Sequence, residues 1–335
     1  MSRVFYLAKR VFSINCRQMF SKVREVKLRS GKSSVYILFD MLACGIKYQA
    51  GYMDYALFEM YSLNSAQRKT IVTRGINNSL IKRFNNPAYT DVFDDKRKFN
   101  RAFDPFLNRR WLDLEASSEE DFEKFLKVCP NFMAKPSNGM CGKGIERLSV
   151  SEFDSFHEIE SYLRYKNLYL LEEIVSQHPV MSELHPHSVN TCRVVTITRN
   201  GKTNVAVAYL RIGNGKHVDN FNSCGMVVPV EEDRGEVIYP AINKKGELFE
   251  THPITGTAII GFKIPMWQEV LTLARKAGAV VPQVGLVGWD IALTEKGPLI
   301  IEGNNFPGHD IYSLPPHRTN GIGVLPKLKK AINGL

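Results

Sequence analysis

The sequence predicts an α+β protein, and three observations lead to this fold class. After Pro130, eight short stretches have the composition of strands: Asn131–Lys135, Ile145–Val150, Leu168–Ile174, Thr191–Thr198, Asn204–Leu210, Gly225–Val230, Gly288–Leu293 and Pro298–Glu302. Two helical patterns, Glu152–Arg164 and Pro265–Ala277, lie between strand groups. Residues 199–202 carry an Asn-Gly pair, which favours a tight hairpin turn. Paired strands with helices between them predict antiparallel sheets.

The first third of the chain is expected to be helical, and it carries the basic charge. Residues 1–110 hold 21 Lys and Arg against 8 Asp and Glu, a net charge of +13, whereas residues 111–335 hold 23 against 26, a net of −3. We expect a basic amphipathic helical segment over residues 1–32 and a helical region over residues 33–114. Such local charge fits an anionic membrane, phosphate-rich ligands or a solubilising surface.

The segment 1–32 has two interpretations. Its apolar residues Val4, Leu7, Val11 and Ile14 recur at three- and four-residue spacing among nine basic residues and one acid. A helix of this kind can lie on an anionic membrane, or it can pack its apolar stripe on the body of the protein. Both interpretations stay open at the level of sequence.

Several protein classes are excluded or disfavoured. The apolar stretches are too short to span a bilayer, and no signal peptide is recognisable. The six cysteines are scattered without a Cys-x-x-Cys pair, which argues against a disulfide framework and a zinc site. We therefore expect a cytoplasmic protein, with a peripheral position at the inner membrane face as an extension. Nucleic acid ranks last among the partners, because no RNA-binding signature with interleaved aromatic residues is recognisable.

A glycine-rich loop follows the strand that ends at Lys135. Gly139, Gly142 and Gly144 let backbone N–H groups approach phosphate oxygens, and the lysine adds a positive charge. The Walker spacing and its following helix are missing, so the loop would fold over a nucleotide. The alternative is a glycine-rich hairpin with a solvated lysine.

A second hairpin is predicted near the end of the chain. Residues 295–297 are typical of a three-residue loop with Gly297 in the left-handed conformation. Such a loop pairs Thr294 with Pro298, and this register places Asp290 opposite Glu302.

Two carboxylates that face each other suggest a cation between them. Asn304 lies two residues beyond Glu302 and therefore on the same face as Asp290 and Glu302. Like charges in opposite positions destabilise a hairpin unless a cation compensates them. Two carboxylates and an amide are suitable ligands for Mg²⁺ that holds nucleotide phosphates. The alternative is a register shifted by one residue, with both acids on the surface.

Taken in order, these motifs resemble the ATP-grasp superfamily over about residues 90–310. The lysine–glycine loop, the later Leu170–Ile174 and the series Asp290, Glu302-Gly303-Asn304 and Pro307-Gly308 carry the resemblance. Residues 188–193 and 287–292 resemble the sugar-transfer-associated or glutamate-ligase-like branch. The resemblance implies a lid subdomain at about residues 115–175 and a core subdomain at about 176–325, which clasp ATP. The usual Rossmann-like N-terminal subdomain is not recognisable.

The resemblance also assigns roles to residues at matching positions. The expected ATP-binding residues are Lys96, Lys135, Gly139, Gly142, Gly144, Glu172 and Glu173. Arg193 and Arg211 would hold the γ-phosphate and the developing acyl phosphate, and Asn220 and Asn222 would line the acceptor side. Asp290, Glu302 and Asn304 would hold Mg²⁺. Each arginine could instead form a structural ion pair, and each glutamate at 172 and 173 could be a solvated edge charge.

The resulting expectation is an ATP- and Mg²⁺-dependent ligase that joins a small-molecule carboxylate to an amine through an acyl phosphate. The resembled branch tends to belong to cell-surface polysaccharide pathways, so sugar-linked substrates are candidates. One alternative keeps the fold but phosphorylates a hydroxyl group, as a small-molecule kinase does. Another is a non-catalytic protein that binds a membrane surface through its basic segment.

Overall fold

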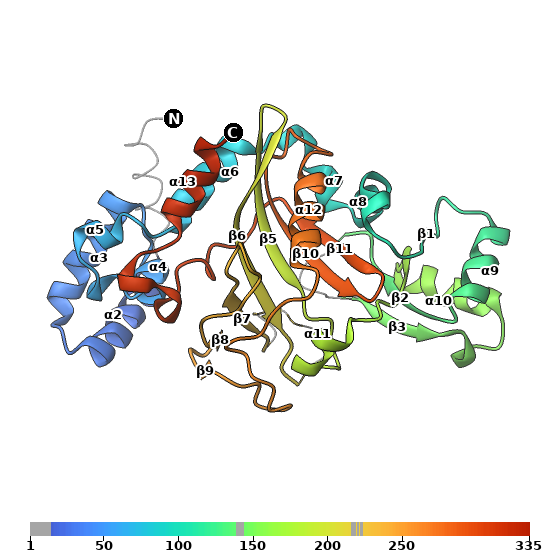
Figure 1. Cartoon of the computed structure of the whole chain (residues 1–335), viewed down its shortest axis with the longest axis horizontal. Helices are drawn as coiled ribbons and strands as arrows, with labels where there is room; N and C mark the ends of the chain where they lie inside the picture. Colours follow the sequence, from blue (N-terminus) through green and yellow to red (C-terminus); the bar gives the residue numbers. More distant parts are fainter. Residues whose placement is uncertain (1–14, 139–143, 216–218, 220, 222–223) are drawn as a thin grey trace. The chain divides into compact units, whose positions relative to one another are not determined.

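The computed structural model describes residues 15–138, 144–215, 219, 221 and 224–335, and the chain divides into two compact units (Figure 1). One unit combines the described residues up to Arg83 with Gly308–Lys330. The other consists of Phe84–Pro307 and Ala331–Leu335. The boundaries expected at residues 32, 114 and 175 stay predictions.

The described chain begins with a series of helices, and strands and helices are interspersed from Trp111 onward. The helices are α2 (Cys16–Ser30), α3 (Ser34–Tyr48), α4 (Tyr52–Leu57), α5 (Ser65–Arg68), α6 (Arg74–Phe84), α7 (Asp91–Asp94), α8 (Lys96–Phe103), α9 (Glu119–Val128), α10 (Phe156–Lys166), α11 (Pro179–Leu184), α12 (Trp267–Gly278) and α13 (Leu325–Asn333). The strands are β1 (Trp111–Asp113), β2 (Asn131–Lys135), β3 (Glu146–Ser149), β4 (Leu170–Glu173), β5 (Cys192–Arg199), β6 (Lys202–Ile212), β7 (Met226–Pro229), β8 (Ala241–Asn243), β9 (Leu248–Phe249), β10 (Leu286–Thr294) and β11 (Gly297–Asn304).

The first unit is a helical body with its own core. Helices α2, α3 and α4 bury Val26, Ile37, Met41 and Tyr55 in one apolar cluster. Gly31, in the left-handed conformation, ends α2, and the Ser33 hydroxyl group caps α3 by accepting from the Tyr36 N–H. These two signals produce a tight helical hairpin of α2 and α3.

A C-terminal segment completes this unit. The N–H of Leu325 donates to the carbonyl oxygen of Thr70 at 3.0 Å, and the guanidinium group of Arg318 donates to the carbonyl oxygen of Phe58 at 2.9 Å. These partners are more than 250 residues apart in the sequence, so no local pattern predicts their contact.

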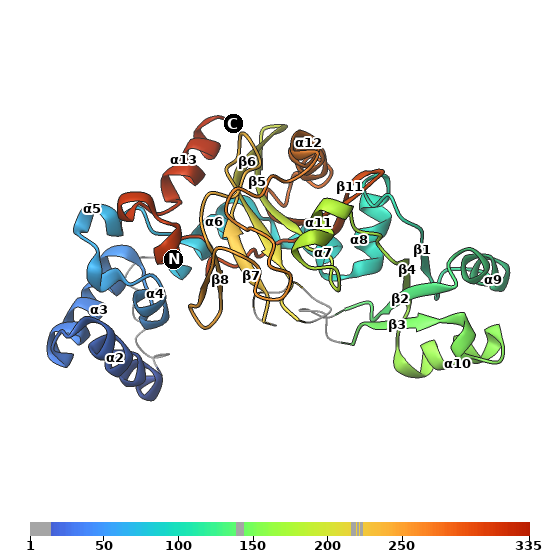
Figure 2. The same cartoon turned by 60° about the horizontal axis from the view of Figure 1, so that its bottom comes forward.

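The second unit contains two antiparallel sheets. The four-stranded sheet has the order β1-β4-β2-β3, and α9 and α10 pack Phe125 and Ile159 against its Phe132 and Leu171. Figure 2 shows these two helices beside the small sheet. Lys135 and Glu172 belong to the other face, because side chains alternate along a strand.

The seven-stranded sheet has the order β11-β10-β5-β6-β7-β8-β9. Helix α12 lies along it (Figure 1) and shares one core with Val194, Leu210 and Trp289. The ring of Phe103 from α8 meets the Trp289 ring edge-on at 5.3 Å between centroids. The next position, Asp290, therefore faces away from this core.

All eight predicted strands are present, and the antiparallel arrangement is confirmed. The hairpin at Asn200-Gly201 is also confirmed, since Arg199 pairs with Lys202 and both turn residues have positive φ. Within the region expected to be helical, residues 91–103 form two helices, α7 and α8. The chain breaks at Asp95, whose carboxylate caps α8 by accepting from the N–H of Arg97 at 2.8 Å.

The predicted three-residue loop at 295–297 is also wrong. Thr294 pairs with Gly297, so the loop contains two residues, and Ile301 is an extra residue in β11 that forms a bulge. The shorter loop shifts the register by one residue, and the bulge shifts it back. The pair Asp290–Glu302 is therefore confirmed, although the reasoning from the loop was not correct.

Candidate active site

Four charged side chains form a row across the large sheet. Glu302 of β11 is opposite Asp290 of β10, and Asp290 is opposite Arg193 of β5. Arg211 of β6 lies on the same face, two positions beyond Tyr209, which is the residue opposite Arg193. The row therefore runs from two acids on one side to two arginines on the other.

Asp290 is the centre of this row. Its Oδ2 accepts from Arg193 Nη2 at 2.7 Å and from Arg211 Nη1 at 2.6 Å, and its Oδ1 accepts from Arg193 Nε. Burial alone would raise the pKa of Asp290, but the two guanidinium groups outweigh burial and hold the pKa well below its usual range. Asp290 is thus a charged group that fixes both arginines.

Glu302 has a different environment, although it is adjacent. Its side chain reaches solvent, yet its pKa is raised to about 7. Surrounding protein groups remove much of its hydration, and the negative charge of Asp290 opposite adds to the effect. A group whose charge is disfavoured in this way would gain from a nearby cation.

Two glycines make the row possible. A Cβ on Gly288 would lie 3.2 Å from Cδ of Arg193, so any side chain there would press on that arginine. A Cβ on Gly303 would lie 2.9 Å from the rings of both Phe99 and Trp289. The spacing Glu-Gly-Asn therefore has a packing cause, because the middle position faces the aromatic core.

The small sheet supplies a second charged cluster around Glu172. The carboxylate of this buried residue accepts from Arg109 Nη2 at 2.7 Å, from Asn100 Nδ2 at 2.8 Å and from Lys135 Nζ. Burial would raise the pKa of Glu172, but Arg109 and Lys135 together hold it well below its usual range. Arg109 also donates to the carbonyl oxygen of Ile300 in β11 at 2.6 Å, so it joins the two sheets.

Glu173 does not lie with Glu172. As the next residue of β4, it has the opposite orientation, and its carboxylate accepts from the N–H of Arg110 at 3.0 Å. The pair of side chains is partly exposed. The sequence assigned both glutamates to one nucleotide contact, whereas the structure brings only Glu172 to Lys135.

Lys96 is the first residue of α8, and several contacts fix that helix end. Its backbone N–H donates to the carbonyl oxygen of Ser137, two residues after Lys135, at 2.9 Å. Burial lowers the pKa of Lys96, and the charge of Lys135 lowers it further, while Glu302 and Glu172 act in the opposite direction. Lys96 is thus within electrostatic reach of both charged clusters.

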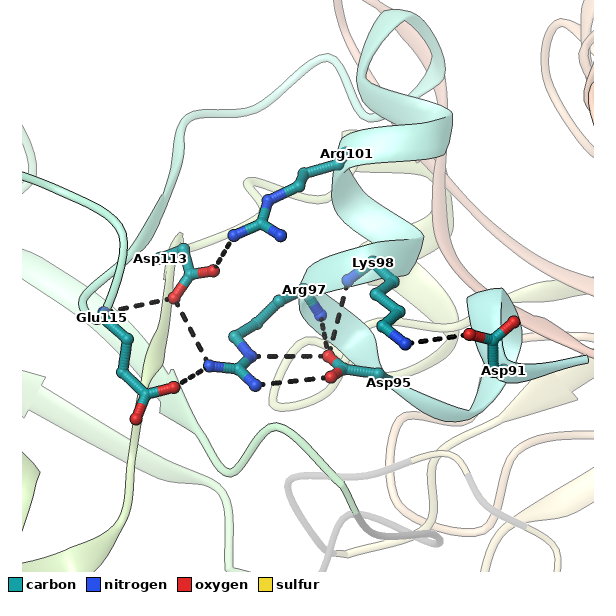
Figure 3. Close-up of polar contacts among 7 residues, drawn as sticks. All are labelled: Asp91, Asp95, Arg97, Lys98, Arg101, Asp113 and Glu115. Atoms are coloured by element: carbon teal, nitrogen blue, oxygen red, sulfur yellow. Dashed lines mark hydrogen bonds and ion pairs between the residues drawn. The ribbon is translucent and has the colours of Figure 1, made fainter.

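Figure 3 shows how α8 is tied to the small sheet. Arg97 pairs with Asp95 at its own helix start, with Asp113 at the end of β1 at 3.7 Å, and with Glu115. Arg101, one turn further along α8, also pairs with Asp113. This ion-pair network holds the first turn of α8, and hence Lys96, beside β1.

Part of the predicted site lies outside the described residues. Gly139 and Gly142 are in this group, as are Asn220 and Asn222. Gly144 is described and has φ +73°, a conformation that favours glycine. The predicted roles of these residues stay predictions.

Sequence reasoning missed three residues that organise the site. Arg109 and Asn100 hold Glu172, and buried Asp219 pairs with Arg211 at 3.1 Å while it accepts from the N–H of Thr191 at 3.0 Å. Each is a single polar residue without a motif around it. No local sequence pattern identifies them, because the residues that they contact are distant in the sequence.

The residues present fit a divalent cation of the Mg²⁺ type. Glu302, Asn304 and Asp290 share one sheet face and offer oxygen ligands, which this cation prefers. Asn304 is opposite Gly288, and its Oδ1 accepts from the N–H of Phe306 at 2.9 Å. Loss of hydration and the negative charge of Asp290 raise the pKa of Glu302, so a cation beside Glu302 would favour its charged form.

Comparisons with solved structures find several proteins of low similarity. The ATP-grasp ligase PsnB in complex with a minimal precursor has 12% identity and a TM-score of 0.43, with 75% of this chain and 64% of that chain covered. D-alanyl-alanine synthetase A from Vibrio cholerae has 14% identity and a TM-score of 0.41, with coverages of 73% and 61%. L-amino acid ligase from Bacillus licheniformis has 11% identity and a TM-score of 0.38, with coverages of 64% and 41%. This chain therefore spans less than two thirds of the length of each of these proteins.

No curated protein matches the sequence. The comparison with protein families gives a match over residues 75–332, to the family described as sugar-transfer associated ATP-grasp. This match covers both sheets and all charged residues of the candidate site. The resemblance predicted from the motifs is confirmed, and the chain belongs to the sugar-transfer associated ATP-grasp family.

Proposed function

We propose that this protein is an ATP-dependent ligase that joins a carboxylate to an amine through an acyl phosphate. The observation that carries the proposal is the charged row Glu302–Asp290–Arg193–Arg211 on one face of the large sheet. Membership of the sugar-transfer associated ATP-grasp family supports the same proposal. No side-chain nucleophile is required.

The positive groups have separate tasks in this proposal. Lys135 and Lys96 would neutralise the phosphates of ATP, with Glu172 and its partners keeping Lys135 in place. Arg193 and Arg211, both fixed by Asp290, would stabilise the negative charge that develops during phosphoryl transfer. Such preorganised charges lower the barrier because they need little rearrangement in the transition state.

The proposed reaction has two steps. An oxygen of the substrate carboxylate attacks the γ-phosphorus of ATP, the bond between that phosphorus and the bridging oxygen breaks, and ADP leaves. The amine nitrogen then attacks the carbonyl carbon, the bond to the phosphate oxygen breaks, and inorganic phosphate leaves. The amine loses one proton, and an amide remains.

Glu302, Asn304 and Asp290 are the residues that would hold Mg²⁺. The ion would supply positive charge for the phosphates. Both oxygens of Asp290 already accept from arginine, and Oδ1 of Asn304 accepts from the N–H of Phe306, so the carboxylate of Glu302 would provide the main ligand. The main contact with the metal ion would then come from β11.

The substrates are proposed from the family description. A sugar-transfer associated family suggests that the carboxylate or the amine is linked to a sugar. We also propose a role in cell-surface polysaccharide formation, in the cytoplasm or at the inner membrane face. Binding of residues 1–32 to an anionic membrane stays a proposal, and its first fourteen residues lie outside the described part of the chain.

The test is incubation of the full chain with ATP, Mg²⁺ and a pool of amino acids and sugar acids, followed by mass detection of products. A ligase produces ADP and a new amide. The variant Glu302→Gln should lose turnover, whereas Glu295→Gln, an exposed position in the loop of the same hairpin, should keep it.

The outcomes separate the alternatives. A stable phosphate ester in place of an amide would identify a small-molecule kinase with the same fold. Absence of ATP turnover together with absence of ATP binding would contradict the assignment as an enzyme and favour a non-catalytic role.

A further inference from the structure

Helix α3 carries large apolar side chains that are exposed along its outer face. Val35, Phe39, Leu42 and Ile46 are 66%, 67%, 43% and 58% exposed, and they follow one another at spacings of four, three and four residues. This spacing places them on a single stripe along the helix. The surface therefore presents about three turns of continuous apolar side chains to solvent.

The opposite side of α3 is apolar as well. Ile37, Met41, Cys44 and Tyr48 are buried in the core of the helical unit. An ordinary surface helix has one apolar face and one polar face, whereas a helix that is apolar on both sides is normally covered on both. Contiguous exposed apolar surface of this kind usually marks an interaction site.

The neighbouring helix α2 carries exposed positive charge. Its Arg17, Arg24 and Lys27 are exposed, together with the apolar Phe20 and Leu28 at 51% and 87% exposure. The views in Figures 1 and 2 agree that α2 and α3 lie side by side. Because both helices bury their inner residues in one core, both outer faces point away from it.

The local charge is positive even after pairing is considered. Residues 15–50 contain seven Lys and Arg and two Asp and Glu, a net charge of +5. Of the two acids, Glu25 pairs with Lys22 and Arg29, and Asp40 forms two contacts of 2.7 Å with Arg68. The surface around the stripe therefore attracts anions.

We propose that the outer faces of α2 and α3 form a docking surface for an anionic lipid bilayer, with α3 in the plane of the interface. The stripe Val35–Phe39–Leu42–Ile46 enters the boundary between headgroups and acyl chains, and the basic residues of α2 contact anionic headgroups. The main membrane contact in this proposal is therefore α3, which follows the segment 1–32. The proposal does not depend on the ligase reaction.

Two further observations favour this occupant. Helix α3 has 15 residues and is about 22 Å long, which is shorter than the hydrocarbon core of about 30 Å. Among the described residues no helix is long and apolar enough to cross a bilayer, so contact would be parallel to the surface. A second copy of the chain would bring the same basic face into contact and would be repelled.

The test is co-sedimentation of the full chain with phosphatidylcholine vesicles, with and without about one third phosphatidylserine. The double variant Phe39→Glu/Ile46→Glu should reduce binding to the anionic vesicles by about tenfold or more, since both apolar contacts are replaced by like charges. The matched control is Tyr165→Glu/Leu248→Glu, which makes the same charge change at exposed apolar positions of the other unit. Binding of this control should stay within about twofold of the original.

A second variant tests the electrostatic part. Arg24→Glu/Lys27→Glu should weaken binding to anionic vesicles, and added salt should weaken binding of the unchanged protein in the same direction. Circular dichroism confirms that each variant is folded. Absence of binding by the unchanged protein, or equal binding by Phe39→Glu/Ile46→Glu, would overturn the proposal. A dimer that this variant dissociates, with no vesicle binding, would identify a contact between copies and would also overturn it.

Discussion

The ion pair between Arg109 and Glu172 permits a stability prediction with an internal control. We consider the change Arg109→Met, which keeps a long unbranched side chain but removes the guanidinium group. That group donates to Glu172 at 2.7 Å and to the carbonyl oxygen of Ile300 at 2.6 Å. The side chains of Arg109 and Glu172 are 3% and 4% exposed. The variant thus leaves a buried acid and a carbonyl group with fewer donors.

The expected magnitude follows from burial. Removal of one partner from a buried ion pair costs about 3–5 kcal/mol of unfolding free energy, because the remaining charge is poorly compensated. Glu172 keeps its contacts with Lys135 and Asn100, so the lower end applies, about 3 kcal/mol. Loss of the link to β11 should also make that strand more accessible to amide hydrogen exchange.

The adjacent residue provides the control. Arg110 contacts Glu173 at 3.5 Å with side chains that are 61% and 37% exposed. Arg110→Met should therefore change the unfolding free energy by less than about 1 kcal/mol. The assay is urea unfolding of both variants, with comparison of midpoints at an unchanged m-value. Equal losses in the two variants would refute the argument that burial determines the cost.

Three further predictions concern the charged clusters. Lys135→Ala should weaken ATP binding by about tenfold or more in a calorimetric titration, since a phosphate loses its cation; unchanged affinity would move the nucleotide site elsewhere. Asp290→Asn should cost about 3 kcal/mol in urea unfolding, because Arg193 and Arg211 lose their shared charge; a cost below that of an exposed pair would contradict this view. The lowered pKa of Glu172 means that its charged form stabilises the folded state at pH values above 4.5, its ordinary pKa, and that this stabilisation is lost as the pH falls toward the folded-state pKa. Glu172→Gln should therefore flatten the decline of the unfolding midpoint in acid.

The strands were predictable because their signal is local. Strands β5, β6, β10 and β11 combine β-branched residues with turn residues at their ends, and the pairing of Asp290 with Glu302 was correct. The predicted loop was one residue too long, and the bulge, which was not predicted, compensates for this difference in the register. A bulge such as Ile301 has no clear sequence signature, since its cause is the packing of the whole strand.

Other elements had too little local signal. Strands β8 and β9 contain three and two residues, which is too short for an alternating pattern. Arg109 lies in a region where basic residues are common, and only the fold shows that it reaches Ile300. The return of residues 308–330 to the first helices is likewise a consequence of tertiary structure.

The charged row changes the interpretation of Asp290. In the sequence it was one of three metal ligands, selected because it faces Glu302. In the structure its carboxylate carries three donor contacts from Arg193 and Arg211, which hold its pKa low, whereas Glu302 has a raised pKa of about 7. Two adjacent carboxylates thus have opposite electrostatic environments. Asp290 is best suited to fix the arginines, whereas the Glu302 carboxylate is poorly hydrated and faces the negative charge of Asp290. A cation held at this face would therefore depend more on Glu302 than on Asp290, even though both belong to the same cross-strand pair.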